Sequence, residues 1–370
     1  MSTTGKAAVF AGAHEPLSVR TFEVVAPADG EVLLRMKRSG ICGTDVHIAE
    51  GRLKIPPARV ILGHEFVGEV DAVGTDAAAD GLGAPLAVGD VAIACVAVPC
   101  GECVNCARGH SANCLAFGVT YFRDPEEPPH FHGGYAEYLH SPAKNVVKVP
   151  DGVGLDAAAA FACAGPTVMH AFGLAGDLDG DELVVVQGCG AVGLFAIAFA
   201  ASAGCDVVAI ASGATPARME LARRLGAREV FDYRATAEEE RAKEIRDLAV
   251  ELGRGDGADV VFEASGSPAA IPEGMRLART LGRYVVPGQY SDSGPVEIEP
   301  HLITFKALKI VGSGQYTIAD VGAYLGFLRE RPAVQELAAS CVSHRYEIDR
   351  ANEALADVAA GRVVKGVFSA

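Results

Sequence analysis

The stretch from Leu183 to Cys205, LVVVQGCGAVGLFAIAFAASAGC, constrains the fold of this chain most, because it contains no charged residue. Its length would allow it to cross a bilayer as one helix. Gln187 and the glycines at positions 188, 190, 193 and 204 instead favour a buried strand, a tight turn and a helix. We therefore expect a strand-turn-helix unit and no membrane association.

The sequence GCGAVG within this stretch predicts a dinucleotide-binding loop. It follows an apolar strand and opens a helix, which is the context that a G-x-G-x-x-G motif requires. Gly188 would form the tight turn, Gly190 would let the backbone approach a pyrophosphate, and Gly193 would let the helix pack closely on the strand. Val192 belongs to the same loop, and the phosphates would lie at the amino terminus of the helix.

The choice between NAD and NADP depends on the end of the next strand, DVVAIAS. A carboxylate normally binds the adenosine ribose about 20 residues after the glycine loop, but this strand ends in Ser212, Gly213 and Ala214. Without a carboxylate a 2′-phosphate is tolerated, and Ser212 or Arg218 could hold it. Arg218 is equally explained as a solvated helix residue. The sequence leaves both cofactors open and slightly favours NADP.

The pattern of strands and helices divides the chain into two domains. The first 150 residues contain short valine- and isoleucine-rich runs separated by turn residues, which predicts a β domain. From about residue 157, apolar strands alternate with helices, and this α/β pattern predicts a parallel sheet covered on both faces. One of these helices would start with Thr215 as N-cap and end at Gly226. For residues 311–370, periodicity leaves open a separate cap or a return to the first domain.

Composition and charge exclude several classes of function. The chain has 370 residues, of which 50% are hydrophobic, enough for a core in each of two domains. A net charge of −15 provides no basic surface for a nucleic acid. The segment MSTTGKAAVF lacks the features of a secretion signal, so we expect a reducing, cytoplasmic location.

Four cysteines in C-x2-C-x2-C-x7-C spacing predict a closed metal site. Disulfides are disfavoured in a reducing compartment, whereas four thiolates at this spacing suit a tetrahedral structural zinc. A zinc ribbon that binds nucleic acid is the alternative from another class of protein, but it would need basic neighbours, and only Arg108 is present, against Glu102. The four predicted ligands are Cys100, Cys103, Cys106 and Cys114.

Two further segments, GICGTDVH and GHE, contain ligands for a second metal. Cys42 and His64 would form an open, catalytic zinc site only with a third ligand from elsewhere, since such a site takes three protein ligands and one exchangeable position. Spacing alone explains them equally well as a buried cysteine and a hydrogen-bonded histidine.

The order of these motifs resembles that of a known family. GICGTDVH, GHEFVGEV, the four-cysteine segment, CAGPTVMHA and GCGAVG follow one another as in the zinc-containing medium-chain dehydrogenase/reductases, the alcohol-dehydrogenase-like proteins. The resemblance covers essentially the whole chain. It implies a GroES-like β catalytic domain over residues 1–160 with a zinc lobe at about 95–116, a Rossmann domain over 161–310, and a return to the catalytic domain over 311–370. The active site would lie in the cleft between the domains.

The resemblance also implies roles for single residues around the catalytic metal. Cys42, His64 and Cys163 would be the zinc ligands, and Glu65 would be a carboxylate beside the metal. Some relatives use a glutamate as the third ligand, but AFACAG offers only Cys163. Asp45 would orient a ligand such as His64, unless it is a surface carboxylate.

Thr44 and His47 occupy the positions of the family's proton relay. A hydroxyl two residues beyond a metal ligand can reach the reacting oxygen, and an imidazole can pass a proton to solvent near neutral pH. Thr167 resembles a position near the nicotinamide, although a hydroxyl at a helix start explains it nearly as well.

The expected activity is zinc-dependent hydride transfer between an alcohol, secondary or cyclic, and NAD(P)+, giving an aldehyde or ketone. The chain would bind two zinc ions and form a homodimer or homotetramer. A reductase of C=C or C=N bonds with the same fold is the alternative enzyme. A non-catalytic NAD(P)-binding protein is a further alternative, but the presence of both relay residues in such a protein would be a coincidence.

Some motifs are not explained by this activity. We expect Cys95, Cys189, Cys205 and Cys341 to pack in apolar cores. His130 and His132 are expected in a surface or interface loop. That loop, residues 117–134, would shape the substrate cleft or a subunit contact, and its aromatic residues, Tyr121, Phe122 and Phe131, weakly favour an apolar substrate.

Overall fold

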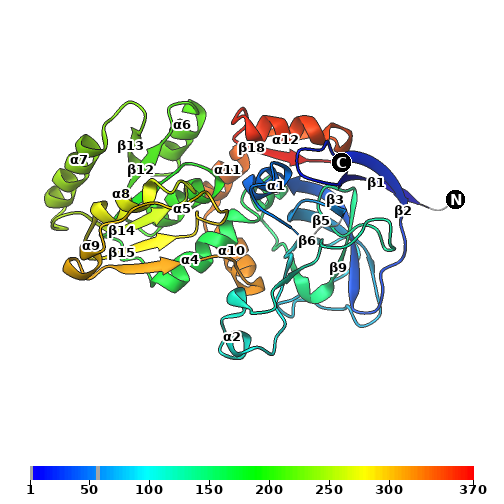
Figure 1. The fold of residues 1–370 in the computed structure, drawn as a ribbon. Helices are drawn as coiled ribbons and strands as arrows, with labels where there is room; N and C mark the ends of the chain where they lie inside the picture. Colours follow the sequence, from blue (N-terminus) through cyan, green and yellow to red (C-terminus); the bar gives the residue numbers. More distant parts are fainter. Residues whose placement is uncertain (1–2, 56–58) are drawn as a thin grey trace. The chain divides into compact units, whose positions relative to one another are not determined.

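The computed structural model describes residues 3–55 and 59–370 (Figure 1). The chain divides into two compact units. Unit 1 comprises Met1–Pro166 and Gln315–Ala370, and unit 2 comprises Thr167–Gly314. The domain borders expected from the sequence, after residues 160 and 310, lie close to these positions.

Unit 1 is built on a seven-stranded, largely antiparallel sheet. Its strand order is β10-β6-β5-β3-β18-β17, and β9 also pairs with β3. Val32, Leu34 and Met36 are spaced two residues apart on β3 and are almost completely buried in the core of the unit, as the alternation of a strand requires. The strands are β3 (Glu31–Gly40), β5 (Glu65–Val73), β6 (Val91–Ala94), β9 (Tyr138–Pro142), β10 (Val146–Lys148), β17 (Val342–Tyr346) and β18 (Lys365–Phe368).

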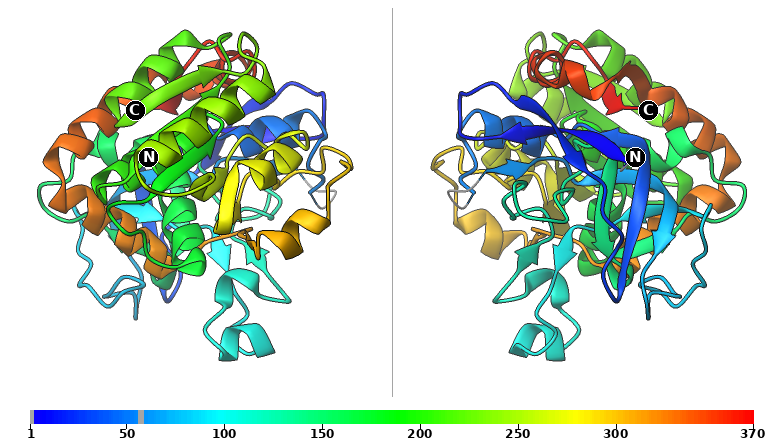
Figure 2. Two further views of the ribbon diagram at one scale, coloured as in Figure 1. Left: turned by 90° about the vertical axis from the view of Figure 1, so that its left-hand side faces the viewer. Right: turned by 90° about the vertical axis from the view of Figure 1, so that its right-hand side faces the viewer.

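Smaller elements complete unit 1. A three-stranded sheet has the order β2-β1-β4, with β1 and β2 in dark blue in the right-hand view of Figure 2, and β7 pairs with β8. These strands are β1 (Thr4–Phe10), β2 (Ser18–Glu23), β4 (Val60–Ile61), β7 (Ala97–Val98) and β8 (Gly118–Val119). The helices are α1 (Gly43–Ala49), α2 (Val104–Ala107), α3 (Leu155–Ala160), α10 (Ile318–Glu330), α11 (Pro332–Cys341) and α12 (Ala351–Ala359), with the 3-10 turns η1 (Ser111–Asn113), η2 (Ala143–Asn145) and η3 (Ile348–Arg350).

The carboxyl-terminal segment joins the sheet of unit 1. β18 pairs antiparallel with β3, where Val367 lies opposite Gly40, and parallel with β17. Figure 1 shows the red β18 beside the blue β3. Of the two arrangements that periodicity left open for residues 311–370, the chain adopts the return to the first domain.

Unit 2 is a six-stranded parallel sheet with the order β13-β12-β11-β14-β15-β16. The order reverses direction between β11 and β14, so right-handed crossovers carry the helices to both faces, and the predicted Rossmann fold is confirmed. The strands are β11 (Leu183–Gln187), β12 (Asp206–Ala211), β13 (Ala227–Asp232), β14 (Ala258–Glu263), β15 (Ala278–Val286) and β16 (Lys309–Gly312). The helices are α4 (Ala164–Ala175), which starts in unit 1, α5 (Ala191–Ser202), α6 (Pro216–Arg224), α7 (Glu238–Glu251), α8 (Ala270–Leu277) and α9 (His301–Phe305).

The apolar stretch Leu183–Cys205 forms the expected strand-turn-helix, β11 followed by α5. No helix within the described residues has both the length and the apolar character needed to cross a membrane. α6 starts after Thr215 as predicted, but the Thr215 hydroxyl donates to the backbone oxygen of Ser212 at 3.2 Å instead of capping the helix with its side chain.

Candidate active site

The predicted ligands of the catalytic zinc meet in unit 1. Cys42, His64, Glu65 and Cys163 each offer one ligand atom, and these four atoms lie within 4.8 Å of one another. Cys42 is the N-cap of α1, His64 and Glu65 stand at the start of β5, and Cys163 lies between α3 and α4. The cluster joins residues that are up to 121 positions apart in the chain, from Cys42 to Cys163. β5 pairs with β3, and α1 follows β3, so this pairing brings His64 and Glu65 to Cys42.

The chemistry of this cluster fits a zinc ion. A hydrogen bond from Cys163 lowers the pKa of Cys42 well below its usual value, and the charge of His64 lowers it further, so the cluster favours a thiolate. Glu65 Oε1 is buried and has no hydrogen-bond partner among the described residues. Two sulfurs, an imidazole and an unpartnered carboxylate oxygen are donors of the type that catalytic zinc takes.

Asp45 holds two of these ligands in position. It is completely buried. Its Oδ2 accepts a hydrogen bond from the backbone N–H of Cys42 at 3.1 Å, and its Oδ1 accepts one from the backbone N–H of Gly63 at 3.2 Å and lies 3.4 Å from His64 Nδ1. The alternative of a surface carboxylate is therefore wrong. With Nδ1 directed to Asp45, His64 has Nε2 free for a metal.

Glu65 forms a buried ion pair with Lys365 of β18, a contact that the sequence analysis missed. Lys365 donates to Glu65 Oε2, and also to the backbone oxygen of Ile41 at 3.5 Å. Burial raises the pKa of Glu65 to about 7, although the Lys365 charge opposes this shift. Gly40 leaves room for the carboxylate, since a Cβ there would lie 2.0 Å from Glu65 Oε2. The lysine within the apolar run VVKGVF was the signal in the sequence.

The two predicted relay residues lie on one face of α1. Thr44 and His47 are three positions apart, and Thr44 Oγ1 lies 3.7 Å from Cys42 Sγ. Partial burial lowers the pKa of His47, and the charge of Arg52 lowers it further. His47 is therefore a neutral base near pH 7.

The loop of residues 117–134 packs Tyr121 against His64, one of the predicted metal ligands. The Tyr121 and His64 rings are stacked with their centroids 6.5 Å apart, and Phe122 contacts Tyr121 edge-on at 5.0 Å. Phe131 instead belongs to the core of unit 1 and has no exposed surface. Of the three aromatic residues, Tyr121 and Phe122 therefore form the group beside His64.

The two histidines of this loop differ in exposure. His132 is buried, so the expected surface position is wrong for this residue, and His140 of β9 is also buried. His130 is half-buried and stacks on Phe22 at 5.1 Å. Burial lowers the pKa of His132 and of His140 to about 4 in each case. They are neutral core residues at neutral pH.

The four lobe cysteines form the second cluster. Three Sγ–Sγ distances are 3.5 Å for Cys103–Cys106, and 4.0 Å for Cys100–Cys106 and Cys103–Cys114. Four sulfurs around a zinc with bonds of about 2.3 Å would be about 3.8 Å apart, whereas a disulfide would require about 2.05 Å. Backbone N–H groups lower the pKa of Cys103 to about 6, with the one from Cys106 contributing most. This geometry fits a closed zinc site.

The cofactor loop of unit 2 has the expected backbone. Gly188 has φ +101°, and a Cβ there would lie 2.8 Å from the Ser265 backbone nitrogen. A Cβ at Gly193 would lie 1.8 Å from the Gly188 oxygen, which explains the close packing of helix and strand. A Cβ at Gly190 would meet no atom within 4 Å, so its backbone is open to a phosphate. Val192 is half-buried in the first turn of α5.

A carboxylate does lie at the end of β12, contrary to the sequence analysis. Asp232, the last residue of the neighbouring β13, accepts a hydrogen bond from the Gly213 N–H at 2.8 Å, and this bond lowers its pKa. Ser212 is half-buried beside it. Arg218 is half-buried, and this burial lowers its pKa, so it is not a freely solvated residue.

The remaining predictions concern one threonine and four cysteines. Thr167 lies half-buried in the first turn of α4, and its role near the nicotinamide stays a prediction. The four other cysteines, Cys95, Cys189, Cys205 and Cys341, are buried as expected.

A parallel nucleotide-binding sheet together with a buried cluster of sulfur and nitrogen donors is the combination that defines a zinc-dependent dehydrogenase. Comparison with known proteins agrees. Residues 28–151 match the alcohol dehydrogenase GroES-like domain and residues 191–330 match the zinc-binding dehydrogenase family.

Similar proteins cover nearly the whole chain. 5-exo-Hydroxycamphor dehydrogenase of Pseudomonas putida is 34% identical over 95% of each chain, and L-threonine 3-dehydrogenase of Vibrio parahaemolyticus is 35% identical over 78% of each. Among solved structures, an alcohol dehydrogenase of Thermotoga maritima aligns with a TM-score of 0.90 at 30% identity over 99% of each chain. A putative zinc-binding dehydrogenase of Sinorhizobium meliloti bound to NADP aligns with a TM-score of 0.81 at 26% identity over the full length of both.

The chain belongs to the zinc-containing medium-chain alcohol dehydrogenase family. It is an oxidoreductase that transfers hydride between an alcohol and a carbonyl compound with NAD(P).

Proposed function

We propose that this dehydrogenase oxidises a secondary or cyclic alcohol with an apolar carbon skeleton, and that Cys42, His64 and Cys163 hold its catalytic zinc. The main support for this proposal is that the ligand atoms of these three residues and of Glu65 lie within 4.8 Å of one another. A zinc ion bound there would polarise the substrate oxygen and lower the pKa of the alcohol. Cys100, Cys103, Cys106 and Cys114 would hold a second, structural zinc.

Thr44 and His47 form the proton relay in this proposal. The Thr44 hydroxyl lies beside Cys42 and accepts the proton of the alcohol. His47, on the same face of α1, has a lowered pKa, so it is neutral near pH 7 and can accept a proton and release it to solvent. Glu65, held by Lys365, keeps a carboxylate beside the ligands.

Two observations support an apolar, cyclic substrate. Tyr121 stacks on His64 and Phe122 packs on Tyr121, which gives one wall beside the metal ligands an aromatic surface. The relative with 34% identity over 95% of both chains acts on a hydroxycamphor, a cyclic alcohol.

We propose NADP as the preferred cofactor. Arg218 is half-buried on α6, the helix that follows Ser212, and Ser212 stands where a ribose-binding carboxylate would otherwise stand. Asp232 opposes this preference, but its Oδ1 is engaged by the backbone N–H groups of Gly213 and Arg234. Replacing Ser212 with Asp should shift the preference toward NAD, and Arg218→Ala should raise KM for NADP more than KM for NAD. Wild-type preference for NAD would show that Asp232 decides the selectivity.

We also propose that two chains pair through β16, either as a homodimer or as the dimer unit of a homotetramer. β16 is an edge strand of the parallel sheet, and Ile310 on it is 46% exposed. Phe305 and Leu281 are 80% and 65% exposed. An apolar edge strand is stable when another strand pairs with it. Light scattering should give a mass of two or four chains, and Ile310→Lys should reduce it.

We place the protein in the cytoplasm, because none of its ten cysteines forms a disulfide and its two cysteine clusters would oxidise outside a reducing compartment.

A substrate screen tests the proposed activity. Nicotinamide absorbance is followed with apolar cyclic alcohols, L-threonine, ketones and conjugated alkenes, each with NAD and NADP. We expect cofactor reduction with the cyclic alcohols and two zinc ions per chain. Activity confined to L-threonine would overturn the substrate class, and activity confined to reduction of C=C or C=N bonds would overturn the reaction.

A further inference from the structure

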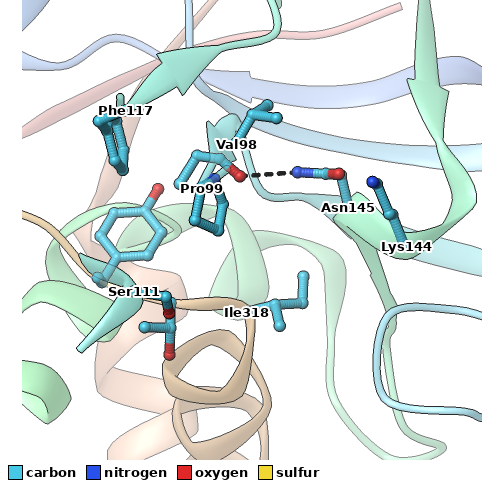
Figure 3. Close-up of a pocket in the computed structure, with 10 residues that line it drawn as sticks. Val98, Pro99, Ser111, Phe117, Lys144, Asn145 and Ile318 are labelled. Atoms are coloured by element: carbon cyan, nitrogen blue, oxygen red, sulfur yellow. Dashed lines mark hydrogen bonds between the residues drawn. The ribbon is translucent and has the colours of Figure 1, made fainter. Parts of the chain in front are cut away.

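The root of the cysteine lobe encloses a cavity that the proposed reaction does not use. Its volume is about 150 Å³. Val98, Pro99 and Phe117 from the two ends of the lobe, and Ile318 at the start of α10, line it (Figure 3). An apolar cavity of about this size in another protein binds benzene. The cavity therefore has room for a single six-membered ring.

The walls of the cavity are fixed by hydrogen bonds. Asn145 Nδ2 donates to the backbone oxygens of Ala97 at 2.8 Å and Cys95 at 3.2 Å, and Figure 3 shows Asn145 beside Val98 and Pro99. Thr317 caps α10 and exchanges hydrogen bonds with Asp320. Because the walls are preformed, a ligand need not order them.

Two residues of the lining carry hydroxyl groups. Tyr316 lines the cavity and is only 5% exposed, and Ser111 lines it from the lobe. A hydroxyl group can both donate and accept a hydrogen bond. A ligand oxygen would pair with these groups, while the charge of Lys144, which also lines the cavity, disfavours a cation.

We propose that this cavity is a binding site for a neutral, monocyclic compound that carries one hydroxyl group, of the phenol or cyclohexanol class. The ring fills the space between Phe117 and Ile318, and its oxygen pairs with Tyr316. None of the residues that line the cavity belongs to the cluster of Cys42, His64, Glu65 and Cys163, so the site is distinct from the proposed zinc ligands.

The test uses 4-fluorophenol and fluorobenzene as probes, titrated into the full-length, zinc-loaded protein and followed by 19F NMR. We expect one saturable site per chain for each probe. Tyr316→Phe should weaken 4-fluorophenol about fivefold, the value of one hydrogen bond, and leave fluorobenzene unchanged. Ile318→Trp should fill the cavity and abolish binding of both probes.

The controls make the result decisive. Ile303→Trp introduces the same side chain on α9, outside the cavity, and should leave binding and turnover unchanged. Ser111→Phe fills the cavity from the lobe side and replaces Ile318→Trp if that variant loses zinc or helical circular dichroism. Absence of saturable binding to the wild type, or binding that persists in a folded, cavity-filled variant, would overturn the proposal.

Discussion

Lys365 donates a hydrogen bond to Glu65 in the interior of unit 1, where Lys365 is 4% exposed and Glu65 is fully buried. The two residues are 300 positions apart, so this pair fastens the carboxyl-terminal strand to the strand that follows His64. A buried ion pair contributes little net stability, but loss of one partner leaves an uncompensated charge.

Removing the lysine should destabilise the protein. Lys365→Met leaves Glu65 buried without its partner. Because the pKa of Glu65 is already about 7 with the lysine charge opposing the rise, the carboxyl takes up a proton, and we expect a loss of about 1–3 kcal/mol in the free energy of unfolding at neutral pH from the lost hydrogen bonds. Chemical denaturation of the zinc-loaded protein measures it. Lys6→Met, which breaks the exposed pair with Asp349, is the matched control and should change the free energy of unfolding much less, because solvent screens an exposed pair. If Lys365→Met costs no more than Lys6→Met, the pair does not fasten the strand.

The two metal clusters should respond differently to loss of a ligand. Cys42→Ser or His64→Ala should abolish turnover and reduce zinc from two to one per chain, with the fold intact. Cys103→Ser should also remove one zinc, but its main effect should be a lower melting temperature, because the lobe is held by its metal. Zinc content, melting temperature and kcat separate the two effects. Full activity in a folded, zinc-free enzyme would contradict a catalytic zinc.

His47 should set the acidic limb of the pH–rate profile. Its pKa is lowered from 6.5, so it is neutral at pH 7 and becomes protonated only as the pH falls below 6.5. We expect kcat/KM for alcohol oxidation to fall in that range, and His47→Gln to lower the rate and remove this limb without loss of zinc. A profile with the same limb in His47→Gln would exclude the residue from the relay.

The buried histidines His132 and His140 should make the protein sensitive to acid. Each has a pKa of about 4 in the fold against 6.5 when unfolded, so the unfolded state binds more protons as the pH falls from 6.5 to 4. Stability is therefore complete above pH 6.5 and is lost through this window, by about 1.4 kcal/mol per pH unit for each histidine. His140→Leu should shift the midpoint of acid unfolding to lower pH, whereas His110→Leu in the lobe should not. Equal midpoints for wild type and His140→Leu would contradict this account.

Local signals in the sequence predicted much of the fold and the four-cysteine cluster. The glycine loop and the four-cysteine spacing lie within short segments, so their geometry follows from local backbone requirements, as at Gly188 and Gly193. The catalytic cluster spans distant segments, and the residues alone left Cys42 and His64 open until the family resemblance supplied Cys163.

The missed features depend on strand neighbours. Asp232 reaches Gly213 only because β13 lies beside β12, and Lys365 reaches Glu65 only because β18 enters the sheet next to β3. His132 and Phe131 lie in a loop rich in proline and charge, but they pack inward on the core of unit 1. Such contacts arise from tertiary pairing, which a local pattern does not encode.

A crystal of the zinc-loaded protein, with anomalous scattering measured at the zinc absorption edge, tests the central claim most directly. We predict one peak bonded to Cys42 Sγ, Cys163 Sγ and His64 Nε2, at about 2.3 Å from the sulfurs and about 2.1 Å from the nitrogen. A second peak should lie among the four lobe cysteines. Absence of the first peak from a crystal of active enzyme, with those three side chains turned away from one another, would contradict the account.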